Sequence, residues 1–147
     1  MRKQKSDAWK WLPLVLGVGS LANAAWMLIE PLRWYHELPA GVPDFGDFNP
    51  HFVRDIGCAF LTVGAAQLWA AGSPRHRYPL VAVTAVFLVA HAILHIYDTA
   101  RGAVDLHHAW LDLPGVYLPA VLTAILTFVL ARQERGPHAD SARSEAA

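Results

Sequence analysis

Residues 79–98 read PLVAVTAVFLVAHAILHIYD, a stretch whose only Asp, Glu, Lys or Arg residue is the final aspartate. An α-helix of about 20 apolar residues is long enough to cross the hydrocarbon core of a bilayer. The stretch therefore predicts a membrane-spanning helix. Its last part also carries His91, His95 and Asp98, at spacings of four and three residues that place them on one helix face. The sequence thus predicts a span with a patch of ionisable groups near one end.

The chain of 147 residues, 54% of them hydrophobic, contains three further apolar blocks of similar length. In lipid a spanning segment must satisfy its own backbone hydrogen bonds, and the blocks lack the alternation of barrel strands, so they predict helices. We therefore expect an all-α protein, an integral membrane four-helix bundle. Its predicted parts are a four-span domain over residues 1–132, with spans at about 11–29, 52–71, 79–97 and 113–131, and a disordered tail over residues 133–147.

Lysine and arginine residues predict the orientation of the bundle, because they are enriched in cytoplasmic loops. They cluster before the first span, in the turn at 72–78 and after the fourth span, whereas the segments 30–50 and 98–112 hold few. Both termini are therefore expected in the cytoplasm, with those two loops facing outward. The tripeptide at 22–24 also resembles a signal-peptide cleavage site, but the apolar run continues to Ile29, which favours an uncleaved span.

Composition limits the function classes. The formal net charge is zero, so no overall positive field favours nucleic acid, and Cys58 is the only cysteine, which excludes an internal disulfide. The sequence contains no GxSxG, HExxH, P-loop or dinucleotide-binding motif. The expected partners are the lipid bilayer and either further copies of the chain or another membrane protein. Whether the chain is an enzyme stays open.

The second apolar block is preceded by FNPHFVRDIG, residues 48–57, which predicts where its helix begins. Asn49 can cap the free backbone N–H groups, and Pro50 fits the first helical position without losing a hydrogen bond. His51, Arg54 and Asp55 then fall in the first turns, at the outer membrane surface. Glycines of the first two spans are expected to let helices approach closely, namely Gly17, Gly19, Gly57 and Gly64.

The two polar patches are predicted to meet at one depth. The second and third spans are joined by a short turn and should be antiparallel neighbours. Counting about 1.5 Å per residue from that turn puts Asp55 level with His95, and His51 level with Asp98. Imidazole nitrogen and carboxylate oxygen suit zinc or iron. The predicted metal ligands are therefore His51, Asp55, His95 and Asp98, with Arg54 and His91 beside them as candidate catalytic residues.

Readings without such a metal site remain open for the same residues. Arg54 can neutralise the carboxylates, which would make the patch a purely structural network, or the patch can be a proton relay or a pocket for a small ligand. A haem-binding electron-transfer bundle is a further alternative, with His51 and either His91 or His95 as axial ligands. An accessory subunit with no enzymatic activity would need only the structural network.

A second pair of histidines, His107 and His108, precedes the fourth span near Asp105 and Asp112. These histidines are either solvated loop residues or a lid that reaches over the polar patch. Loop histidines are ordinarily solvated, so the first reading is the default.

Two segments, FNPHFVRDIG and HAILHIYD (residues 91–98), carry a resemblance to small bacterial four-span membrane proteins of DoxX-like architecture. The resemblance covers residues 9–132 in overall plan and implies a compact bundle of four helices. It brings no established activity with it. The expected function is therefore that of a multi-pass membrane protein with an outward-facing His/Asp/Arg pocket for a metal ion or a small ligand, with metal-dependent chemistry if a metal binds.

Overall fold

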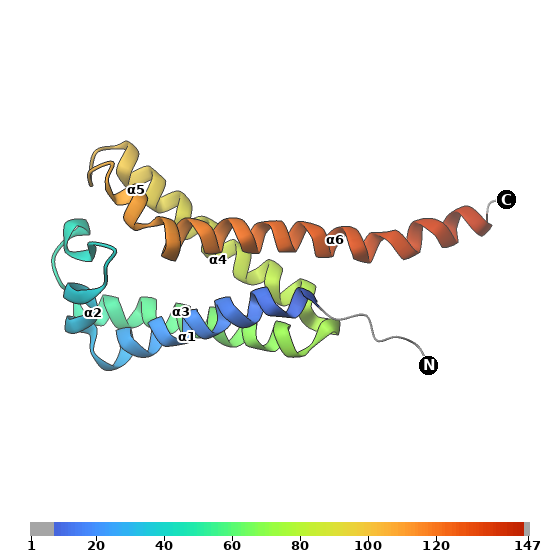
Figure 1. Ribbon diagram of the computed structural model, residues 1–147, viewed down its shortest axis with the longest axis horizontal. Coiled ribbons are helices and arrows are strands. Elements are labelled where there is room, and N and C mark those ends of the chain that lie inside the picture. Colours follow the sequence, from blue (N-terminus) through green and yellow to red (C-terminus); the bar gives the residue numbers. More distant parts are fainter. Residues whose placement is uncertain (1–7, 146–147) are drawn as a thin grey trace.

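The computed structural model describes residues 8–145, with side chains for residues 8–134, and this part of the chain is helical and contains no strand. The all-α prediction is therefore confirmed for the described residues. Long helices run between two ends of the molecule, and short helices form the connections (Figure 1). In chain order the elements are η1 (Ala8–Lys10), α1 (Trp11–Ile29), α2 (Pro31–Glu37), η2 (Val42–Phe45), α3 (Pro50–Gly72), η3 (Pro74–His76), α4 (Arg77–Ala100), α5 (His108–Leu111), the π-helical turn η4 (Leu113–Tyr117) and α6 (Leu118–Glu145).

Three helical segments are long and apolar enough to cross a membrane, namely Ala8–Ile29, Pro74–Ala100 and Leu113–Glu134. The helix α3 has 23 residues but is not among them, and polar side chains such as Asp55 and Gln67 lower its mean hydropathy. The structure thus supports a membrane protein with three candidate spans. The predicted second block does form a long helix, and its role as a fourth span stays a prediction.

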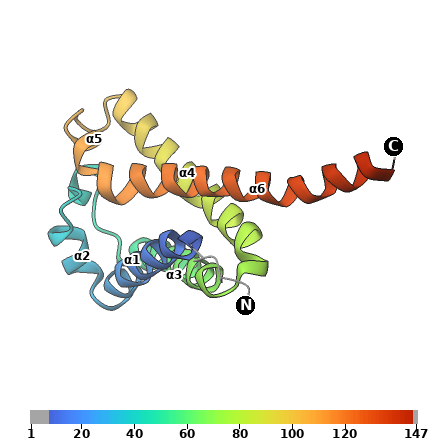
Figure 2. The ribbon, with the colours of Figure 1, turned by 45° about the vertical axis from the view of Figure 1, so that its right-hand side comes forward.

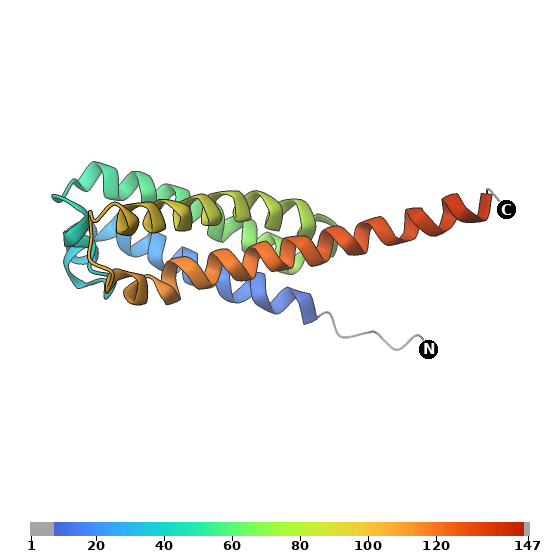
Figure 3. The same cartoon turned by 90° about the horizontal axis from the view of Figure 1, so that it is seen from above.

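The helices α1 and α3 lie side by side along their length (Figures 1 and 3). A Cβ on Gly64 would lie 2.7 Å from the Leu21 side chain, and one on Gly17 would lie 2.8 Å from that of Leu68. These distances are too short for a real side chain, so the pair depends on glycine for its close approach. The predicted close approach is confirmed for these two glycines and for Gly57. It is wrong for Gly19, whose Cβ position has no atom within 4 Å.

The helices α4 and α6 pack against this pair through two apolar clusters and buried polar contacts. Gln67 of α3 donates a hydrogen bond of 2.8 Å from Nε2 to Oγ1 of Thr84 on α4, and both side chains are buried. A buried amide and hydroxyl that satisfy each other stabilise the α3–α4 pairing modestly. The cluster residues are Val63, Leu88, Ala92, Val116 and Ala120 toward the end that holds α2 and α5, and Ala70, Val81, Leu126 and Leu130 toward the opposite end.

The start of α3 has the predicted cap. Oδ1 of Asn49 accepts hydrogen bonds of 3.1 Å from the backbone N–H groups of His51 and Phe52, and Pro50 is the first helical residue. The sequence predicts a disordered tail from Gln133. In the structure, α6 instead continues as helix to Glu145 and projects beyond the other helices (Figure 1). The beginning of α1 and the end of α6 lie at the same end of the molecule, opposite α2 and α5 (Figures 1 and 3).

Candidate functional site

The end of the molecule that holds α2 and α5 contains a buried His–Asp pair. Nδ1 of His95, near the end of α4, lies 2.7 Å from Oδ2 of Asp112, which follows α5. The Asp112 side chain is 0% exposed and that of His95 is 15% exposed. Oδ1 of Asp112 has no hydrogen-bond partner among the described residues. A buried carboxylate is costly unless it is paired, so His95 is the group that makes this position tolerable.

The backbone after α5 explains how Asp112 reaches the interior. Its carbonyl accepts hydrogen bonds from the N–H groups of Val116 at 2.8 Å and Tyr117 at 3.2 Å, which forms the wide π-helical turn η4. Pro114 lies inside this turn and has no N–H group to donate. Turns of this kind are rare and often mark functional positions. The turn joins α5 to α6 and holds the carboxylate against α4.

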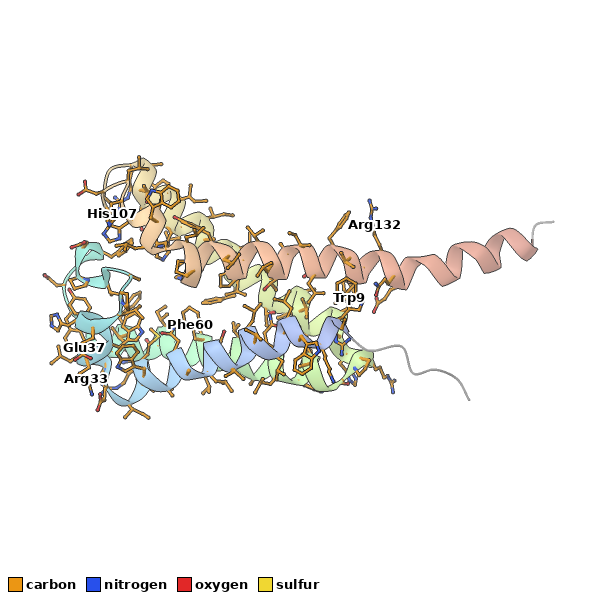
Figure 4. The ribbon with its side chains drawn as sticks, in the orientation of Figure 1. Trp9, Arg33, Glu37, Phe60, His107 and Arg132 are labelled. Atoms are coloured by element: carbon orange, nitrogen blue, oxygen red, sulfur yellow. The ribbon has the colours of Figure 1, made fainter. Side chains whose placement is uncertain are left out.

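His91 continues the site one helical turn deeper along α4. Its ring meets that of His95 edge to face, with the centroids 4.6 Å apart. On its other sides it stacks on Phe87 of α4 at 5.8 Å and meets Phe60 of α3 at the same distance. Figure 4 shows Phe60 between the α1/α3 pair and the α4/α6 pair. The imidazole pair therefore ends in an aromatic, apolar environment.

A short loop covers the site from outside. Figure 2 shows the segment between α2 and α3 reaching toward α5. Phe45 of η2 contacts the rings of two histidines. Its ring centroid lies 5.0 Å from that of His95 and 5.1 Å from that of His108. Beside it, Oδ2 of Asp44 lies 2.8 Å from Nε2 of the buried His108. Gly41 has a φ of 63° and allows the loop to turn at this point. The covering loop, residues 41–46, is thus attached to α5 by one polar contact.

The two histidines before the fourth span, expected to be either solvated or part of a lid, differ from each other. His108 is buried and contacts both Asp44 and Phe45, so it helps to hold the covering loop in place. His107 is exposed at the end of the molecule that holds α2 and α5 (Figure 4), as an ordinary loop histidine would be.

The predicted metal ligands do not form one cluster. Nε2 of His51 lies 3.4 Å from Oδ2 of Asp55 on the exposed surface of α3, with the two side chains 87% and 59% exposed. Asp98 pairs with Arg101 at 2.9 Å, and His95 pairs with Asp112. Among the described residues, no group of three or more His, Cys, Asp or Glu side chains is placed to hold a metal ion. The four-residue metal site therefore stays a prediction that this geometry does not support.

Helix rotation explains why the predicted patches do not meet. Phe60 contacts His91, which agrees with the levels predicted for α3 and α4 by counting residues from the turn between them. Asp55 precedes Phe60 by five residues, which at about 100° per residue turns it about 140° away from α4. The candidate Arg54 also points elsewhere, and its Nε lies 3.4 Å from the carbonyl oxygen of Leu28 at the end of α1. The candidate His91, by contrast, does lie in the buried site.

The sequence pattern identifies Asp112 only as a neighbour of the loop histidines and does not predict its place in the site. The available signal was its position, since it is a carboxylate directly before an apolar span and four residues after His108. Its pairing with His95 depends on α5 folding back onto α4, which no local spacing predicts.

No protein-family model, curated protein or solved structure matches this chain. The resemblance to DoxX-like proteins therefore remains an expectation from two segments. The function has to be argued from the geometry of the site.

Proposed function

We propose that this chain is a multi-pass protein of the bacterial cytoplasmic membrane, with α1, α3, α4 and α6 as four spans and both termini in the cytoplasm. Three of these helices are apolar enough to span, and α3 lies along α1, which supports a fourth span beside it. The distribution of basic residues supports the orientation. Cysteine-accessibility labelling tests it, since a cysteine at 40–47 should react from outside and one at 73–77 only after permeabilisation.

The function assigned to the outward end is that of an acid–base site built on His95 and Asp112. The observation that carries this proposal is the 2.7 Å contact between imidazole Nδ1 and a fully buried carboxylate. A carboxylate that accepts from Nδ1–H leaves Nε2 of the neutral ring free to accept a proton. Once Nε2 is protonated, the same carboxylate stabilises the imidazolium. Such a pair can take a proton from a ligand and return it.

His91 lies beside the acid–base site and does not open a path across the membrane. Its ring centroid is 4.6 Å from that of His95 in an edge-to-face contact, so the two imidazoles pack against each other. Beyond it lie Phe60 and Phe87, whose rings contact His91 and offer no proton-accepting group. Protons are therefore exchanged on the outer side only. The ligand in this proposal is a small polar molecule that arrives from that side.

Nitrogen NMR of histidine-labelled protein in lipid bilayers tests the acid–base site. Neutral His95 should carry its proton on Nδ1. Asp112→Asn should change the tautomer of His95. Asp55→Asn is the matched control and should leave the tautomer of His95 unchanged. If His95 carries its proton on Nε2, or keeps the same tautomer without Asp112, the proposal is wrong.

A metal ion is the second candidate for the same place. Nε2 of His95 makes no hydrogen bond with another described residue, and Asp112 holds Nδ1 in the way that a carboxylate commonly holds the second nitrogen of a metal-binding imidazole. Zinc or iron would suit an imidazole ligand at Nε2. Metal analysis of purified protein, wild type against His95→Ala, decides between the two proposals. Metal that is lost in the variant supports the metal site, a Soret band supports haem, and metal-free protein with the expected NMR behaviour supports the acid–base site.

A further inference from the structure

The outward surface of α3 carries a polar stripe, which we define as His51, Asp55, Cys58 and Thr62. These residues are spaced by four, three and four positions, so they share one face of the helix. All of them are exposed. Phe60, which contacts α4, lies on the opposite side of α3. The polar stripe therefore points away from the other helices of the chain.

The polar stripe lies at a depth where its neighbours are apolar. The contact between Phe60 and His91 sets α3 against α4, and by that register Asp55 falls level with His95. The α4 side chains exposed at this level are Ile93, Leu94 and Ile96. This step rests on the proposed placement of α3 in the membrane. In that placement Asp55 lies just inside the span, whereas His51, level with the exposed Arg101, lies at its outer edge.

Lipid chains cannot satisfy the polar groups of the stripe. Hydrocarbon offers no hydrogen-bond partner, and an ionisable side chain inside a membrane generally faces protein or a wet cavity. The His51–Asp55 contact of 3.4 Å is long and leaves most of the carboxylate without a partner. Thr62 differs, because its hydroxyl already donates to the carbonyl of Cys58 at 3.0 Å. The group that lipid leaves unsatisfied is therefore the carboxylate of Asp55, with the imidazole of His51 one turn nearer the membrane surface.

We infer that a second copy of this chain covers the polar stripe. Two copies inserted in the same direction are related by a twofold axis along the membrane normal, so their α3 helices run parallel and present the same face to each other. The stripe is complementary in charge to itself, since His51 of each copy can lie beside Asp55 of the other. The small side chains of Cys58 and Thr62 then let the two helices approach closely below these pairs.

Oxidative cross-linking through Cys58 tests this inference, because the chain has no other cysteine. The full-length protein is reconstituted at high lipid-to-protein ratio and treated with a mild oxidant. We expect a disulfide-linked dimer. The matched control carries Cys58→Ser and Ile93→Cys, which moves the only thiol to an exposed α4 position at a similar depth. The control should give no dimer above the level of random collision.

A second variant tests whether the polar groups hold the two copies together. His51→Leu with Asp55→Leu keeps Cys58 and makes the face compatible with lipid, so the cross-linked fraction should fall about tenfold. A monodisperse monomer in detergent shows that this variant still folds. Equal cross-linking through positions 58 and 93, a wild type that stays monomeric, or a disulfide only to a different protein would each overturn the inference. Since no readout involves His95, failure here is distinguishable from failure of the acid–base proposal.

Discussion

Two of the His–Asp pairs at one end of the molecule, His51–Asp55 and His95–Asp112, differ in almost every physical respect. The pair His51–Asp55 is local, four residues apart on one helix, with a distance of 3.4 Å and two largely exposed side chains. The pair His95–Asp112 joins two elements, has a distance of 2.7 Å, and contains a fully buried carboxylate. An electrostatic contact is stronger in a low-dielectric interior, and an unpaired polar group is costly there. The comparison teaches that the same two residue types form a surface contact in one place and a chemical site in the other.

The largest expected effect on stability comes from removing the carboxylate of one pair, compared with removing that of the other. Asp112→Ala should lower the free energy of unfolding by about 2–4 kcal/mol, because it removes a hydrogen bond to a charged group and leaves His95 partly buried without its partner. Asp55→Ala should cost less than about 1 kcal/mol in the separated chain, as for other exposed pairs. Reversible unfolding in mixed micelles measures both. Equal losses would mean that burial does not distinguish the pairs.

Double-mutant cycles provide the control for this experiment. The cycle of His95→Ala with Asp112→Ala should give a coupling of about 1–3 kcal/mol, as found for contacting residues in one network. The cycle of His51→Ala with Asp55→Ala should give less than about 0.5 kcal/mol in detergent dilute enough to separate any copies of the chain. A small coupling in the first cycle would show that Asp112 is tolerated for a reason other than His95.

A smaller effect is expected from uncovering the buried pair. Phe45→Ala removes the ring that contacts both His95 and His108, and should cost about 0.5–1.5 kcal/mol plus the lost apolar burial. It should also admit water to His95. Faster modification of His95 by a histidine-selective reagent, read by mass spectrometry, checks this. Phe48→Ala is the matched control, since Phe48 contacts Tyr35 and not the histidines. If His95 reacts equally fast in the wild type and in both variants, Phe45 does not cover the site.

The same comparison shows what the sequence could predict. Spans, helix starts and helix depth follow from periodicity and capping, which are local properties. Thus the start of α3 at Asn49 and the level of Phe60 against His91 agree with expectation. The direction in which Asp55 points depends on how α3 is rotated, and glycines such as Gly64 decide that by packing α3 against α1. The pairing of His95 with Asp112 depends on a π-helical turn, and neither feature has a signal in residue spacing.

The smallest expected effect comes from an exposed ion pair on another helix, which serves as a reference for His51–Asp55. On α2, Nε of Arg33 lies 3.1 Å from Oε1 of Glu37, and the two side chains are labelled in Figure 4. The hydrogen bond from the Arg33 guanidinium lowers the pKa of Glu37 below its ordinary value. The same hydrogen bond, with the charge of Glu37, raises the pKa of Arg33.

Because the pKa of Glu37 is lowered on folding, its contribution to stability is present at pH values above the unfolded pKa. That contribution disappears as the pH falls through the folded pKa. Glu37→Gln should therefore lower the unfolding temperature slightly at neutral pH and not at all in acid, where wild type and variant should coincide. High salt should remove the difference at neutral pH, because salt screens exposed charges. Thermal unfolding across pH and salt measures this. The cost of Asp55→Ala should shrink with salt in the same way, whereas that of Asp112→Ala should persist, and a salt-sensitive Asp112 would contradict its burial.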